Sequence, residues 1–396
     1  MSVDYLMIVP LFLAVAAGWW LGRSQSNASS RTDALNEQRL SREYFVGLDH
    51  LINEETDEAI ESFIRALEIN SDTIPAHLAL AKLFRRKGEI DRAVGIHQRL
   101  LARPDLSNTD FIRIQTALAR DYQALGLLDR AENLLRDIMR QRSEGEAAER
   151  AHYMLIKLYE QEQEWASALE VASQLKQQAS TAVRAELAHY CCELALASRK
   201  KGDLDAAQRF LRDATVQDPD CCRISLIRAE LFMEQQQWRK AARALQKVLQ
   251  QDARFVPETI APLEQCYAAM DKRDELEKYL RTCLDQAPSA TVIIALAECI
   301  NRRKDVLAAG QFLTDELRKR PSVKGFNRLI DLHIEYGSDS ARQSLTVLRG
   351  LTGQLEQSKP RYQCGHCGFS GRLLHWQCPS CRQWGSTGPI QGLEGE

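Results

Sequence analysis

Apolar residues recur every three or four positions through the long middle of the chain, from about residue 43 to residue 357. This period places them on one face of an α-helix, so the pattern predicts a series of amphipathic helices. After Pro360 the helical period is lost and glycine rises to seven of the last 36 residues. We therefore expect a long helical body followed by a small non-helical tail.

The helical pattern is itself repeated, and one small residue marks each repeat. Successive markers lie 33 to 39 residues apart, and a second, mostly small position lies twelve residues before each of them. Self-similarity at this period is the signature of a solenoid, in which each unit buries its apolar face against its neighbours. The marker is Ala59, Ala93, Ala131, Ala168, Ala207, Ala241 or Ala309, with Leu276 in the one substituted place, and the earlier position is Gly47, Ala81, Ala119, Ile156, Ala195, Ala229, Glu264 or Ala297.

The repeat resembles the tetratricopeptide repeat. An aromatic residue follows the first small position by three, as at Phe84 and Tyr122, and turn glycines follow at Gly88 and Gly126. The small residues allow two helices to approach closely, and a bulky residue four positions after the marker fills the remaining gap. We count eight units from about Tyr44 to Pro321 and a degenerate ninth to about Gln357. The gap-filling residues include Phe63, Leu135, Leu211 and Leu245, and prolines close three units at Pro219, Pro288 and Pro321.

An apolar segment without charge, Tyr5 to Gly22, precedes this body. Eighteen residues of helix span about 27 Å, near the hydrocarbon thickness of a bilayer, and tryptophans at 19 and 20 suit its interface. A cleaved signal peptide is the weaker alternative, because the segment lacks a basic start and a small-residue cleavage site. Arginines cluster after the segment and none precedes it, so the positive-inside rule places the bulk of the chain in the cytoplasm.

Composition limits the remaining possibilities. Gly and Pro make up just under 8% of the chain, against an average of about 12%, so collagen-like and mostly disordered chains are excluded. The formal net charge of −2 gives no basic excess that would indicate a nucleic-acid partner. Eleven cysteines in 396 residues are too few for a disulfide scaffold, and cytoplasmic cysteines are thiols or metal ligands.

Four of the cysteines form two C-x₂-C pairs separated by ten residues: Cys364, Cys367, Cys378 and Cys381. Four thiolates complete a tetrahedral site that suits zinc or iron, and no position stays open for catalysis. A thioredoxin-like redox role is less favoured, because the motif occurs twice and lacks a βαβ context. The metal must supply much of the stability of so short a domain.

The pairs CGHC and CPSC resemble the knuckles of rubredoxin-like and zinc-ribbon domains. We expect His366 and His375 to lie outside the ligand set, and Phe369, Trp376 and Trp384 to form a small core within the tail. The other seven cysteines are dispersed along the helices and are expected to be small buried residues. The sequence contains no P-loop, G-x-G-x-x-G, G-x-S-x-G or H-E-x-x-H motif, so we do not expect an enzyme.

The order of anchor, repeats and CGHC…CPSC ribbon resembles the lipopolysaccharide assembly protein B family of Gram-negative bacteria over essentially the whole chain. The resemblance implies an all-α protein: a right-handed tetratricopeptide-repeat solenoid with one N-terminal transmembrane helix and a small C-terminal metal ribbon built on four cysteines. The expected divisions are an anchor at 1–22, a juxtamembrane tether at 23–42, the solenoid of about nine units at 43–357 and a rubredoxin-like metal-binding domain at 358–396.

The same resemblance implies an inner-membrane adaptor that helps the membrane protease FtsH degrade the deacetylase that commits precursors to lipid A. It also implies a sulfatase-like inner-membrane regulator and other lipopolysaccharide assembly proteins as partners, and iron in the ribbon, although the spacing alone admits zinc. Two alternatives stay open. One is a scaffold that gathers lipopolysaccharide synthesis and export proteins without directing proteolysis. The other is a metal- or redox-responsive sensor that acts through the ribbon.

Overall fold

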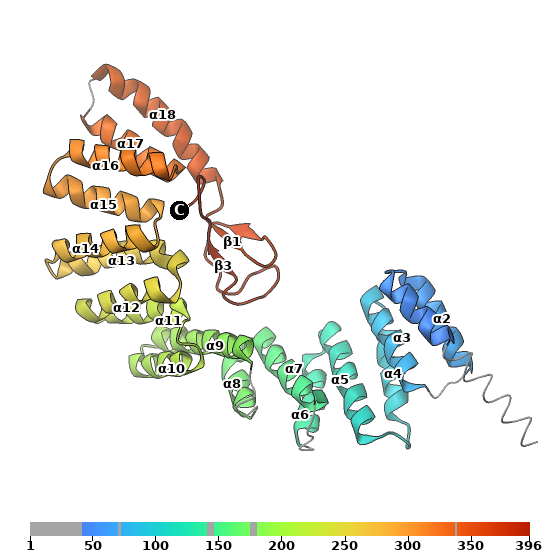
Figure 1. Ribbon diagram of the computed structural model, residues 1–396. Helices are drawn as coiled ribbons and strands as arrows, with labels where there is room; N and C mark the ends of the chain where they lie inside the picture. Colours follow the sequence, from blue (N-terminus) through green and yellow to red (C-terminus); the bar gives the residue numbers. More distant parts are fainter. Residues whose placement is uncertain (1–41, 70–72, 141–145, 175–179, 337–338) are drawn as a thin grey trace, which may run out of the picture. The chain divides into compact units, whose positions relative to one another are not determined.

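The computed structural model describes residues 42–69, 73–140, 146–174, 180–336 and 339–396. They form two compact units, one ending at Gln163 and the other beginning at Glu164. Helix follows helix in both units, and a small three-stranded sheet completes the second (Figure 1). In the described ranges, no helix combines the length and apolar character needed to cross a bilayer. The predicted anchor at 1–22 lies outside these ranges, as does the predicted tether at 23–42 except for its last residue.

The first unit is a succession of helices in which each packs against the next. Helices α3, α5 and α7 also contact one another in that order, as the first helices of successive repeats do. After a helix at residues 42–52, the elements are α2 (Thr56–Ile69), α3 (Ile74–Lys87), α4 (Ile90–Leu101), α5 (Asn108–Ala124), α6 (Leu128–Arg140) and α7 (Glu146–Glu162).

The second unit continues the alternation and ends in the ribbon. Its helices are α8 (Trp165–Ser173), α9 (Thr181–Lys200), α10 (Leu204–Gln217), α11 (Cys222–Glu234), α12 (Trp238–Gln251), the short 3₁₀ helix η2 (Ala253–Phe255), α13 (Val256–Ala269), α14 (Arg273–Gln286), α15 (Ala290–Arg303), α16 (Val306–Lys319), α17 (Val323–Tyr336) and α18 (Asp339–Ser358). Its strands are β1 (Tyr362–Cys364), β2 (Ser370–Gly371) and β3 (Thr387–Pro389).

The repeat markers form the core of both units, as the sequence pattern predicts. All seven alanine markers have no exposed surface, and Leu276 in the substituted place is 2% exposed. The gap-filling Phe63, Leu135 and Leu211 are also fully buried. At Gly47 in the first repeat, a Cβ would lie 3.1 Å from the Phe63 ring, so a larger residue would require this ring to shift.

The turn before the second helix uses the same backbone conformation in all but one of these repeats. The residue five positions before the marker has a positive φ in seven of the eight units that the sequence defines. Glycine tolerates this left-handed region, and Gly88 adopts it with φ 87°. The seven residues are Glu54, Gly88, Gly126, Gln163, Gly202, Gln236 and Asp271.

The ribbon folds around a small antiparallel sheet with strand order β2-β1-β3. Tyr362 pairs with Gly371 on one side and with Pro389 on the other. The ribbon lies beside the helices of the second unit in Figure 1, and η2 contacts β3. Hydrogen bonds and ring contacts join it to α9, α13, α15 and α17, so it is an integral part of this unit.

Candidate metal centre and its docking on the helices

The four sulfur atoms of the two C-x₂-C pairs converge on one point. The Sγ atoms of Cys364 and Cys381 lie 3.7 Å apart, those of Cys367 and Cys378 lie 3.6 Å apart, and all four lie within 4.8 Å of one another. A tetrahedron with metal–sulfur bonds of about 2.3 Å has edges of about 3.8 Å. The separations exceed a disulfide bond of about 2.05 Å, and the cysteines are free thiols. The arrangement could therefore hold one metal ion.

The two halves of the site have the same backbone geometry. The residue after the second cysteine of each pair donates its N–H to the carbonyl oxygen of the first: Gly368 to Cys364 at 3.0 Å and Arg382 to Cys378 at 2.8 Å. Both donors have a left-handed φ, 77° at Gly368 and 58° at Arg382. This tight turn brings the two thiols of each pair to the same side of the chain.

The surroundings of Cys364 favour its thiolate form. Burial raises the pKa of this thiol, but the Ser386 hydroxyl and the backbone N–H groups of Cys367 and His366 lower it to about 6. A hydrogen bond with the backbone at Phe369 likewise lowers the pKa of the Cys367 thiol. Thiolates are the form that binds metal, and backbone N–H groups aimed at sulfur stabilise them.

The structure places the remaining polar candidates outside this cluster. His366 and His375 contribute no atom to it, and His375 packs edge-on against Phe369. The other cysteines are core residues of the helices, as predicted from their dispersal. Cys191, Cys192, Cys221, Cys222, Cys266 and Cys283 are buried, and Cys299 is half-buried.

The ribbon's tryptophans pack against the helices and do not form the internal core that the sequence suggested. Trp384 stacks on His189 of α9, with ring centroids 5.0 Å apart and an angle of 21° between the planes. Its ring also makes T-shaped contacts with Trp165 of α8 and Tyr190 of α9, with centroid separations of 5.9 and 6.0 Å. The prediction was wrong because a ribbon of this size has little interior, so its large rings gain more contact on the neighbouring helices.

Trp376 docks beside Trp384 on a second aromatic residue. It stacks on Phe255 of η2, with centroids 5.1 Å apart and planes at 17°. Cys222, Val248 and Phe255 are buried together there, with Trp376 packed against them. Two stacked pairs therefore fix the same face of the ribbon to the helices.

A buried arginine lies between these two contacts. The guanidinium carbon of Arg223 is 5.6 Å from the Trp376 ring centroid and 5.7 Å from that of Trp384. Its Nη2 donates to Glu193 at 2.6 Å, while Nε and Nη1 have no hydrogen-bond partner and Arg223 is 4% exposed. The aromatic faces thus supply the cation–π attraction that compensates part of this buried charge.

Burial and this neighbouring arginine together hold His189 in its neutral form. Burial, and then the positive charge of Arg223, lower the pKa of His189 to about 3. A neutral imidazole stacks on Trp384 without the cost of burying a second cation beside Arg223. Sequence reasoning missed both residues, because no local motif distinguishes them from other helix residues.

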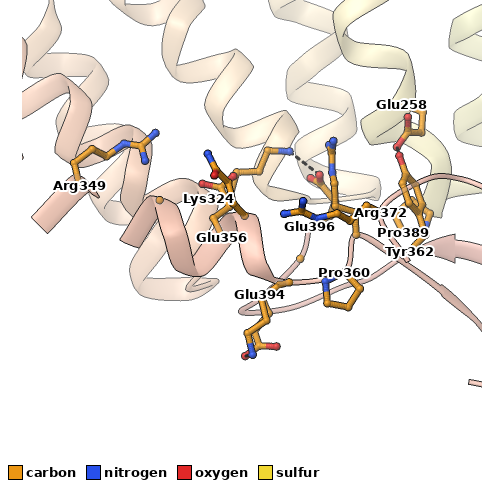
Figure 2. A pocket seen from close by; sticks show the side chains of 15 residues that line it. Glu258, Lys324, Arg349, Glu356, Pro360, Tyr362, Arg372, Pro389, Glu394 and Glu396 are labelled. Carbon is orange, nitrogen blue, oxygen red and sulfur yellow. Dashed lines mark hydrogen bonds and ion pairs between the residues drawn. The ribbon is translucent and has the colours of Figure 1, made fainter. Parts of the chain in front are cut away.

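Polar contacts secure the other side of the ribbon, around a pocket of about 520 Å³. Figure 2 shows Lys324 and Glu396 joined there, and the two side chains form an ion pair at 2.6 Å. Glu396 also accepts hydrogen bonds from the backbone N–H and hydroxyl of Thr291, at 3.0 and 2.6 Å. The Tyr362 hydroxyl donates to Glu258 of α13 at 2.7 Å.

Family models match both parts of this arrangement. One described as a rubredoxin metal binding domain matches residues 362–389. Tetratricopeptide repeat models match residues 76–109, 116–183 and 192–255. Fold and site together define an all-α tetratricopeptide-repeat protein with a small C-terminal cysteine ribbon.

Two relatives make the assignment more specific. The lipopolysaccharide assembly protein B of Escherichia coli (strain K12) is 35% identical over 391 residues, covering 98% of this chain and 99% of the relative. The protein of the same name from Haemophilus influenzae is 33% identical over 399 residues, again covering 98% and 99%. The chain belongs to the lipopolysaccharide assembly protein B family.

Proposed function

We propose that this chain is a non-catalytic adaptor that acts in lipopolysaccharide assembly. The observation that carries the proposal is near-complete coverage by relatives named for lipopolysaccharide assembly. Tetratricopeptide repeats in the same chain support a role in protein–protein contacts, since a stack of helix pairs offers extended binding surfaces.

More specifically, we propose that the adaptor promotes degradation, by the membrane protease FtsH, of the deacetylase that commits precursors to lipid A. A sulfatase-like inner-membrane regulator restrains it, and other lipopolysaccharide assembly proteins bind it. The family resemblance of the anchor, repeats and ribbon supports this form. The helices provide the surface that binds the substrate or the protease. The ribbon, docked on the helices of the second unit, holds those helices in a fixed arrangement.

We further propose that residues 1–22, with their apolar run at 5–22, anchor the chain in the inner membrane as a single span, with the bulk on the cytoplasmic side. The support is the uncharged apolar run and the arginines that follow it. Confinement to the membrane surface raises the effective concentration of the adaptor near a membrane protease, which strengthens weak contacts without new interface.

The proposed cofactor is one metal ion, iron or zinc, held by Cys364, Cys367, Cys378 and Cys381. The sulfur separations and the free thiols support it. The four thiolates would hold the ion, which would supply a structural cross-link between the two knuckles. The chain's own contribution is to orient the thiols through its turns and to dock the ribbon through Trp376 and Trp384.

The proposal is tested by the half-life of the deacetylase in cells depleted of this protein. We expect the half-life to lengthen on depletion and to return to normal when the wild-type chain is restored. Restoration with Cys364→Ser should fail, whereas Cys299→Ser, which removes a thiol outside the cluster, should succeed. An unchanged half-life on depletion would contradict the proteolytic role and favour the scaffold.

A further inference from the structure

The first unit contains a groove with a strongly uneven charge. It has a volume of about 680 Å³ and is lined mainly by α3 and α5, with Arg150 contributed by α7. Among the residues that the structure describes, five cationic side chains line it and no aspartate or glutamate does. They are Lys82 and Arg85 from α3, Arg113 and Arg120 from α5, and Arg150 from α7.

The buried carboxylate beneath this groove is already neutralised. Asp121 has no exposed surface, and its two oxygens bind Arg85 and His97, each at 2.5 Å. It is therefore unavailable to the other four cations. The charge of Arg85 is balanced within the protein, and the groove keeps a positive excess.

Three of the cations have no acidic partner within the described ranges. Lys82 and Arg113 form no ion pair there, and Arg120 donates its Nε only to the sulfur of Met154, at 3.2 Å. Burial, and then the positive charges of Arg85 and Arg150, lower the pKa of Arg120. Cations held close together in one groove favour an anionic ligand.

His97 indicates which kind of anion. It lines the groove, is 1% exposed and has no hydrogen-bond partner at Nε2. Because the Asp121 carboxylate only accepts, Nδ1 of His97 carries the proton between them, which leaves Nε2 as an unsatisfied polar atom at the groove. A peptide backbone offers both N–H donors and carbonyl acceptors to such an atom, whereas a phosphodiester offers acceptors alone.

We propose that this groove binds an extended acidic peptide segment with carboxylates about three residues apart. The cations lie on three successive first helices, and packed helix axes lie about 8–10 Å apart. Three residues of extended chain span about 10 Å. A carboxylate at every third position therefore meets each helix in turn, with Leu78 and Ile112 contacting the residues between. This inference does not depend on the proposed function, because it is argued only from the charges and geometry of the groove in the first unit.

The test is fluorescence anisotropy of the full-length chain with the labelled, capped peptide GDGSDGSDGS. We expect binding that weakens with salt, and at least tenfold weaker binding of the same peptide with Asn in place of Asp. Arg113→Gln and Arg120→Gln should each weaken binding about five- to tenfold. Arg99→Gln is the control, an exposed arginine of α4 that does not line the groove.

Lys82→Gln provides a further variant at an exposed position, where a folding defect is not expected. Equal affinity for the Asp and Asn peptides would overturn the proposal, as would groove variants that bind like Arg99→Gln. Vesicles of phosphatidylglycerol are the comparison ligand. If they bind through Arg113 and Arg120 while the peptide does not, the groove serves an anionic lipid surface and the peptide assignment is wrong.

Discussion

The ring of Trp384 in the ribbon stacks on the imidazole of His189 in α9, with centroids 5.0 Å apart. The two residues lie at opposite ends of the second unit's sequence, so this contact forms only when the ribbon docks. It ties the metal-binding tail to the repeat array. Unfolding of the ribbon should therefore destabilise the helices against which it packs.

The stacked pair should show a measurable coupling. In a double-mutant cycle of His189→Ala and Trp384→Ala, we expect the two changes in unfolding free energy to differ from additivity by about 1 kcal/mol. Urea unfolding of the metal-loaded protein measures it. Leu373 provides the control, because its ribbon position is 72% exposed. The change in unfolding free energy caused by Leu373→Ala should be additive with that caused by His189→Ala. Additivity of the His189 and Trp384 changes would contradict direct stacking.

Arg223 should not tolerate lysine. Arg223→Lys keeps the charge but loses the planar group that faces Trp376 and Trp384, so we expect a loss of about 1–2 kcal/mol in unfolding free energy. The exposed Arg239 of α12 provides the matched control, and Arg239→Lys should change stability by less than about 0.5 kcal/mol. Equal effects of the two substitutions would remove the cation–π interpretation.

The sequence was sufficient to predict the repeats and the thiol cluster, because both are encoded locally. The marker alanines must be small wherever two helices cross, and a C-x₂-C pair brings its two sulfurs together without help from the rest of the fold. Docking is different. His189, Arg223 and Phe255 acquire their roles only through contacts with Trp376 and Trp384, and nothing in their own neighbourhoods distinguishes them.

Acid should weaken the docked state through His189. Its pKa is about 3 in the folded protein and about 6.5 when unfolded, so the unfolded state takes up a proton first as the pH falls. The contribution of neutral His189 to the unfolding free energy is therefore complete above pH 6.5 and is lost progressively below that pH. Between pH 7 and 5.5, we expect wild type to lose about 1 kcal/mol more than His189→Phe, which keeps a stacking ring without a titrating group. Parallel pH profiles from urea unfolding would contradict this.

Glu396 should stabilise the ribbon through its charge. Burial raises the pKa of this carboxyl, but Lys324 and Thr291 outweigh burial and lower it. Glu396→Gln should therefore cost about 1–2 kcal/mol at pH 7, measured by thermal unfolding. The control is Glu394→Gln, whose partner Lys359 lies 2.9 Å away at the exposed surface, and it should have little effect. The two variants should converge as the pH falls below 4.5 and through the lowered pKa of Glu396, where its carboxylate becomes protonated.

The most direct test of the central claim, a single ion held by four thiolates, is the metal content per chain by inductively coupled plasma mass spectrometry. We expect about one iron or zinc per chain in wild type and in Cys299→Ser. In Cys364→Ser and Cys381→Ser, we expect almost none, together with unfolding of the ribbon. Metal content unchanged from wild type in both ribbon variants would contradict the four-thiolate site.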